Sequence, residues 1–188
     1  MILRYPVGEV GSSGPLPPQP PDGGAAVVEF ALLIPVLLTI LFGVIEYGMW
    51  FTDSVGLRHG ARETARNGVV QRWDGGGCQR GPLPGASTHL SDLACTAARV
   101  TPRTSGDLLV RIEVLDATGT PTSTWAVGGT LRICLMNQHH SLSGMVPLPR
   151  QGLITSQVDM AIERADPGQQ EVGGWDAPPA GSDWSWCR

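Results

Sequence analysis

The chain has 188 residues, of which 25 are Gly and 16 are Pro, a high share for a compact globular domain. The formal net charge is −4 and there is no run of adjacent basic residues, which excludes the positive surface that a nucleic-acid-binding protein needs. The mean hydropathy of +0.01 averages two different parts, a dense apolar segment at residues 25–51 and a polar remainder.

Residues 1–24 are unsuited to packed structure, because five Pro residues fall between Pro15 and Gly24. They are interpreted as an extended, solvated leader. The apolar segment that follows carries no charge from Phe30 to Ile45. At about 1.5 Å per residue, Phe30–Phe51 forms a helix of about 33 Å, which matches a hydrocarbon core of about 30 Å. Residues 25–51 are therefore predicted to be a transmembrane helix.

A cleaved secretory signal is the alternative interpretation of this segment. Such signals have a basic start, a shorter apolar run and a small-x-small exit. Here the start holds only Arg4, the apolar run is longer, and Glu46 follows it. These departures favour the membrane helix.

Residues 52–72 are predicted to continue the helix as an amphipathic extension, because small and apolar residues recur at helical spacing. The residues of this stripe are Leu57, Ala61, Ala65 and Gly68. The prediction is one helix of about 45 residues from Ala25 to near Gln71, ended by the Gly run at residues 75–77.

Residues 73–165 are predicted to form a small α+β domain. Residues 78–106 are Pro-containing and are interpreted as loop, whereas alternation of apolar and polar residues predicts strands at 107–115, 130–137 and 153–164. Three strands would make a small antiparallel sheet. Residues 166–188 are a Gly, Pro and Trp-rich tail, expected to be irregular.

Four cysteines follow the membrane segment, an even number that suits an oxidising compartment: Cys78, Cys95, Cys134 and Cys187. Of the three possible pairings, Cys78–Cys95 with Cys134–Cys187 is favoured. Reduced, unrelated thiols are the alternative, and zinc binding fits less well because no C-x-x-C pair occurs.

Two signals disagree on the side of the membrane that holds this domain. Arg58, Arg62 and Arg66 follow the helix whereas only Arg4 precedes it, so the positive-inside rule predicts a cytoplasmic domain. The cysteines predict an extracytoplasmic one, and we adopt that orientation.

The junction from Gly24 to Phe30, GAAVVEF, resembles the processing site of type IVb prepilins. The stretch GAAVVEFALLIPVLLTILFGVIEYG, followed by ARETARNG, resembles the TadE-like family of Tad pilus assembly proteins, which are minor pilins or pseudopilins. Residues 142–164, LSGMVPLPRQGLITSQVDMAIER, are loosely similar to the segment that closes the extracytoplasmic domain in that family.

The resemblance implies cleavage by prepilin peptidase between Gly24 and Ala25. Glu29 would then be the fifth residue of the mature chain and, with Phe30, would serve subunit assembly. A carboxylate in an apolar assembly requires a partner, and the resemblance favours the amine of a neighbouring subunit over the amine of the same chain. Alternatively, Glu29 marks a helix start, where an acid suits the dipole.

The partners implied are the prepilin peptidase, the major pilin, a second pseudopilin and the inner-membrane assembly platform. The expected location is the cytoplasmic membrane, crossed once, or a surface pilus. Glu46 is expected either to lie solvated among lipid headgroups or to contact a partner pilin or the platform.

No catalytic, cofactor-binding or metal-binding residues are predicted. H-E-x-x-H, G-x-S-x-G and P-loop motifs are absent, and the four histidines, His59, His89, His139 and His140, have no acid at a useful spacing. The rival functions are a signal-anchored extracytoplasmic binding or adhesion protein and an enzyme on a pilin-like anchor. The tryptophans of the tail, Trp175, Trp184 and Trp186, either form an adhesive surface or fold back over the sheet.

Overall fold

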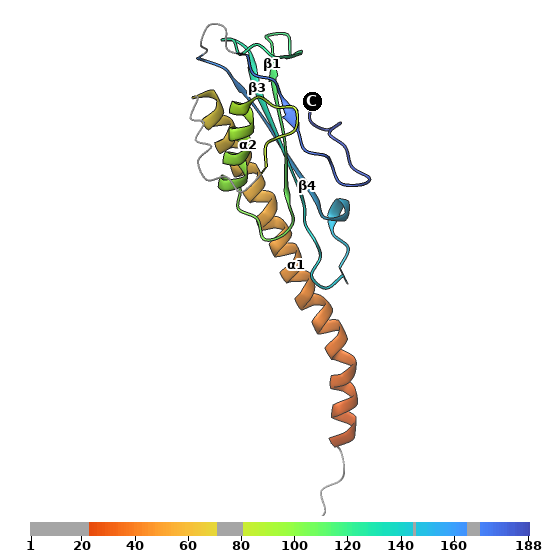
Figure 1. The fold of residues 1–188 in the computed structure, drawn as a ribbon. Helices are drawn as coiled ribbons and strands as arrows, with labels where there is room; N and C mark the ends of the chain where they lie inside the picture. The colour runs from red at the N-terminus through yellow and green to blue at the C-terminus, as the bar shows by residue number, and fades with distance from the viewer. Residues whose placement is uncertain (1–22, 71–80, 145, 165–169) are drawn as a thin grey trace, which may run out of the picture. The chain divides into compact units, whose positions relative to one another are not determined.

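The computed structural model describes residues 23–70, 81–144, 146–164 and 170–188. The chain divides into two units, Met1–Leu38 and Thr39–Arg188. The described part of the first unit is the start of helix α1, and the second unit contains the rest of α1 together with an α+β domain (Figure 1). Residues 1–22 of the expected leader lie outside the described residues.

Helix α1 spans Gly23–Val69, 47 residues, and confirms the prediction of a single long helix. It continues through Pro35. The Gly run expected to end it falls in residues 71–80, which the structure does not describe.

The α+β domain is built on an antiparallel sheet, and its three long strands confirm the three predicted ones. They are β1 (Leu108–Leu115), β3 (Thr130–Gln138) and β4 (Leu153–Ala161). Two short strands, β2 (Pro121–Thr122) and β5 (Gly174–Trp175), pair with the other edge of β1. The strand order is β2-β1-β3-β4, with β5 also on β1.

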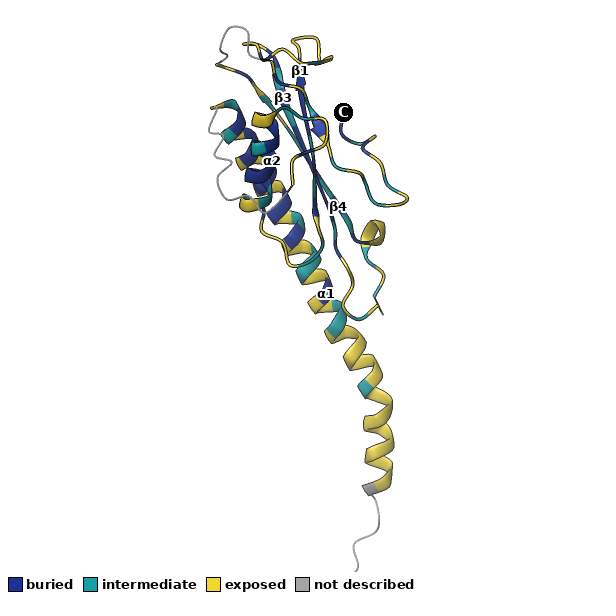
Figure 2. Ribbon diagram, in the orientation of Figure 1, coloured by how far each residue is buried: buried dark blue, intermediate teal, exposed yellow. Residues whose placement is uncertain are grey.

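One face of this sheet packs on the second half of α1 and on helix α2 (Thr88–Val100), and this contact forms the main core (Figures 1 and 2). Alternate side chains of each strand reach this core, since successive side chains of a strand point to opposite faces. They include Val110, Ile112, Leu131, Ile133 and Ile154, each at most 4% exposed.

Helix α2 corrects the expectation of loop at residues 78–106. Leu90, Leu93, Ala94 and Ala97 recur at helical spacing and are fully buried. The prolines that suggested a loop, Pro82, Pro84 and Pro102, flank the helix instead of interrupting it, so they restrict its ends and not its interior.

The C-terminal tail covers the other face of the sheet. Trp184 and Cys187 are buried against Cys134 and Met136 of β3, forming a second, smaller apolar cluster. A disulfide joins Cys134 to Cys187. The domain therefore has three layers: helices, sheet and tail.

The turn that follows β1 is held by an acid. Asp116 accepts a hydrogen bond from the Thr118 hydroxyl (2.6 Å) and others from the Thr118 and Thr120 amides. These bonds favour the carboxylate form and hold the pKa of Asp116 below its ordinary value of 3.8.

Candidate assembly helix

The first half of α1 is exposed along almost all of its length (Figure 2), and most of its exposed residues are apolar. No residue from Gly24 to Ile45 is buried, and Phe30, Leu32, Leu37 and Val44 are each more than 60% exposed. Within the described residues, α1 is the helix with the length and apolar composition to cross a membrane. Apolar surface of this extent requires lipid or apolar partners to cover it.

The predicted processing and assembly residues lie at the start of this surface. Gly24 and Ala25 are exposed in the first turn of α1, and Glu29 and Phe30 are exposed about one turn further on. A β-carbon added at Gly24 would meet no atom within 4 Å. Their roles in cleavage and in subunit contact stay predictions.

The second half of α1 presents a buried stripe to the domain. The stripe predicted from the sequence is buried, and it belongs to two rows with steps of four residues: Asp53, Leu57, Ala61 and Ala65, and Gly56, Gly60, Thr64 and Gly68. Glycine is required where the backbone is closest. A β-carbon at Gly60 would lie 1.9 Å from the Thr101 hydroxyl oxygen, and one at Gly56 would lie 2.3 Å from the Pro102 carbonyl oxygen.

Glu46 lies on the same face as Asp53, seven residues earlier, and is 1% exposed. Its carboxylate accepts bonds from the Ser141 hydroxyl (2.9 and 2.8 Å) and from the Ser143 hydroxyl and amide (both 2.6 Å). The sequence suggested an acid either solvated among headgroups or in contact with a partner. In the structure this acid binds a loop of its own chain.

Asp53 is the second buried acid of α1. It accepts a bond from the Thr104 amide (2.5 Å) through one oxygen and lies 2.7 Å from His139 Nδ1 through the other. Ser105 Oγ lies 2.9 Å from the same ring nitrogen. A nucleophilic triad needs the hydroxyl and the acid on different ring nitrogens. The cluster therefore ties α1 to the sheet and does not activate the serine.

A third buried acid connects the tail to α2. Glu171, 1% exposed, lies 2.6 Å from His89 Nδ1 and accepts a bond from the Ser87 hydroxyl at the start of α2. The sequence gave the histidines no acid at a useful spacing, yet His139 and His89 each contact one, at separations of 86 and 82 residues. Spacing along the chain does not reveal such long-range pairs.

Sequence reasoning missed the buried acids of α1, although a signal for them existed. Glu46 and Asp53 continue the spacing of the Leu57 stripe toward the N-terminus, with steps of seven and four. An acid on the apolar face of an amphipathic helix costs free energy unless it is hydrogen-bonded, so its position alone predicts a partner. The identity of that partner depends on the fold.

The structure joins Cys134 and Cys187, one of the two pairs favoured from the sequence. Cys95 in α2 is also disulfide-bonded. Cys78 lies outside the described residues. The described cysteines are thus all disulfide-bonded, and no group of three or more metal-ligating side chains occurs in the described part of the chain.

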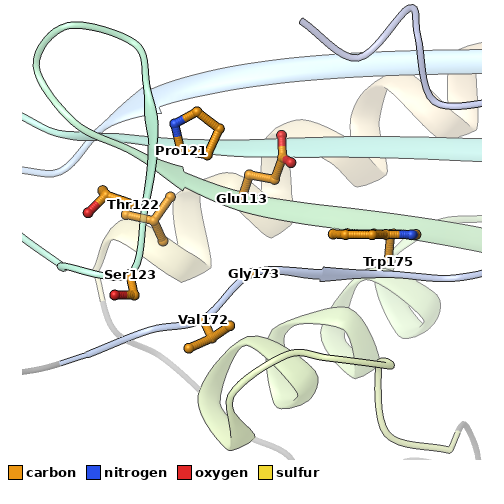
Figure 3. A pocket seen from close by; sticks show the side chains of 8 residues that line it. Glu113, Pro121, Thr122, Ser123, Val172, Gly173 and Trp175 are labelled. Carbon is orange, nitrogen blue, oxygen red and sulfur yellow. The ribbon is translucent and has the colours of Figure 1, made fainter.

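Only one of the three tail tryptophans is substantially exposed. Trp184 is 6% exposed and Trp186 packs against the same cluster, so both fold back over the sheet. Trp175 in β5 is 52% exposed, and the Arg111 guanidinium lies over its ring, 5.5 Å from the ring centre. It borders a shallow pocket of about 230 Å³ in which residues of β2 and β5 flank Glu113 of β1 (Figure 3).

Comparison with known protein families finds a match in the N-terminal helix. Residues 24–66 match the family model described as TadE-like protein. No curated protein and no solved structure matches the chain. The match covers the exposed apolar half of α1 and most of its buried stripe, and it does not extend to residues 142–164. The family connects the chain with Tad pilus assembly, and the apolar helix indicates a membrane-anchored protein. The predicted resemblance is thereby confirmed over residues 24–66, where the chain is similar to TadE-like proteins.

Proposed function

We propose that this protein is a minor pilin or pseudopilin that takes part in the initiation, priming or capping of a Tad-type pilus. The observation that carries the proposal is the two-part helix α1, which matches the TadE-like family and exposes apolar side chains throughout its first half. The second half packs a buried stripe against its own domain. The exposed half is therefore the part available first to lipid and then to the helices of neighbouring subunits.

The proposed maturation is cleavage by prepilin peptidase between Gly24 and Ala25. The new amine on Ala25 would lie one helical turn from Glu29, which is exposed and therefore accessible to a neighbouring subunit. In an apolar assembly that carboxylate needs a positive partner. The amine of the next subunit would supply it and set the register of docking.

The cleavage is tested by intact mass and N-terminal sequencing of the protein extracted from membranes of its native host. The expected chain begins at Ala25. A chain that retains residues 1–24 would contradict the pilin mechanism and leave an uncleaved membrane anchor.

The role of Glu29 is tested by Glu29→Ala, with pili counted by electron microscopy. We expect cleavage and membrane insertion to persist and the number of pili to fall. Glu63→Ala is the matched control, because Glu63 is also an exposed acid of α1 but lies outside the apolar half. Normal piliation with Glu29→Ala would refute the register role.

The alternative function is a signal-anchored extracytoplasmic binding or adhesion protein that never enters a filament. The pocket beside the half-exposed Trp175 favours it (Figure 3). In that case the leader would stay attached, and Glu29→Ala would have no effect on the function of the protein. Trp175→Ala would instead abolish adhesion of the cells to the surface that they bind.

A further inference from the structure

The connection between β3 and β4 is much longer than the sheet requires. β3 ends at Gln138 and β4 begins at Leu153, so residues 139–152 join two neighbouring antiparallel strands. Such neighbours are usually joined by about two to five residues. The base of the loop is closed by a bond from the His139 amide to the Gly152 carbonyl (2.9 Å). The residues between His139 and Gly152 are therefore not needed to connect the two strands.

This loop follows α1 toward the N-terminus of the helix. His139 contacts Asp53, and two and four residues further along the loop the Ser141 and Ser143 side chains reach Glu46. The next residues of the loop contact α1 at Tyr47, beside Glu46, and at Gly43, three residues nearer to the N-terminus of the helix. The Tyr47 hydroxyl donates to the Pro147 carbonyl (3.0 Å), and Val146 Cγ2 lies 4.0 Å from where a β-carbon would stand at Gly43.

These contacts bring the loop into the level of the predicted membrane segment. Asp53 to Gly43 is ten residues, about 15 Å of helix. Gly43, Glu46 and Tyr47 all lie within residues 25–51, the predicted transmembrane helix. Val146 and Pro147 of the loop therefore lie beside a part of α1 that a bilayer would surround.

The composition of the loop suits that position. Residues 141–149 carry no charge, and Arg150 is the first charged residue after them. Leu142 is 69% exposed, while Val146 and Leu148 are half-buried. An exposed leucine beside an apolar helix, followed by an exposed arginine, is typical of a segment at the boundary between acyl chains and headgroups.

The charged side chain of α1 at this level is satisfied within the protein. Glu46 is the acid nearest the loop, and its carboxylate is held by the Ser141 and Ser143 donors. Tyr47 and Phe51 are 43% and 64% exposed on α1, where aromatic side chains commonly mark the membrane interface. The apolar and aromatic side chains at this level are thus exposed, whereas the Glu46 carboxylate is buried and hydrogen-bonded.

We propose that the β3–β4 loop inserts Leu142 into the outer leaflet of the bilayer that α1 crosses. The proposal rests on the proposed membrane span of α1. The partner is a phospholipid surface, and the argument for it is the continuity of the loop with the apolar segment of the helix. The loop then fixes how deep the α+β domain sits on the membrane.

The test uses nitroxide labels on single new cysteines in the full-length protein, reconstituted in vesicles of phosphatidylethanolamine and phosphatidylglycerol. Leu142→Cys reports the loop. Val127→Cys is the matched control, because Val127 is an equally exposed apolar residue (67%) in the β2–β3 connection. Leu37→Cys reports the membrane span itself. Circular dichroism and non-reducing mass spectrometry check that fold and native disulfides persist.

Oxygen concentrates in lipid and a nickel chelate stays in water, so the two relaxation agents measure the depth of each label. We expect the Leu142 label to respond to oxygen and lose its response to nickel, as the Leu37 label does, and the Val127 label to respond to nickel. A Leu142 label that behaves like Val127 would overturn the loop proposal with the membrane span intact. A Leu142 label shielded from both agents would reveal a protein contact and also overturn it. A Leu37 label in water would contradict the span and, with it, the insertion.

Discussion

Three buried acids hold parts of the second unit that are far apart in sequence. Asp53 and Glu46 on α1 bind the region around β3 and its loop, and Glu171 binds the start of α2. Each is at most 1% exposed. Because an unpaired buried polar group costs more than a hydrogen bond returns, these residues specify one packing of the helix on the sheet.

Removal of the Asp53 carboxylate tests whether a buried acid stabilises the packing of α1 on the sheet. Asp53→Ala leaves the Thr104 amide and His139 Nδ1 without this acceptor, and we expect the unfolding free energy to fall by about 1–3 kcal/mol. Asp53→Asn should cost less, because its amide oxygen still accepts one bond. Guanidinium unfolding of the detergent-solubilised protein, followed by tryptophan fluorescence, measures both. Glu63→Ala is the control, and a loss no larger than that of the control would contradict a clamping role.

At the level of elements, helix α1 combines two surfaces with opposite requirements. Its first half is exposed and apolar, and its second half is amphipathic with a stripe of small residues against the domain. Small residues allow the helix to approach the chain at Thr101 and Pro102 closely. The sequence of the stripe is therefore constrained by contact distance as well as by hydrophobicity.

A glycine of this stripe provides the test. In Gly60→Ala the new methyl group overlaps the Thr101 side chain and closely approaches its backbone, so the unfolding free energy should fall by about 1–3 kcal/mol. Gly48→Ala is the matched control on the same helix, because a β-carbon there meets no atom within 4 Å. Equal thermal stability of the two variants would contradict the close approach.

For the molecule as a whole, two opposing signals bear on the side of the membrane on which the domain folds. The Cys134–Cys187 disulfide pins the tail to the sheet and persists best in an oxidising compartment. Arg58, Arg62 and Arg66 are exposed on α1 and favour the cytoplasm. We expect the extracytoplasmic orientation, because it places the disulfide in an oxidising compartment.

We expect a phosphatase that is active only outside the cytoplasm to be active when fused after Arg188 through a flexible linker. A fluorescent protein that matures only in the cytoplasm, fused at the same place, serves as the reciprocal control and should stay dark. Bright fluorescence with an inactive phosphatase would favour the orientation that the arginines predict.

Local periodicity determined what the sequence alone could predict. The uncharged run in α1, the stripe at Leu57 and the three alternating strands each depend on neighbours within a few residues, and each was found. Helix α2 was missed although its spacing was local, because the prolines around it were interpreted as loop signals.

The tertiary structure alone decided the long-range pairs. His139 contacts Asp53 across 86 residues, and Ser143 contacts Glu46 across 97. The sequence shows that these groups need partners, because buried charge and polar atoms must be satisfied. Which partner each group finds is set by the distances that the folded helix, sheet and loop create, and no spacing along the chain encodes those distances.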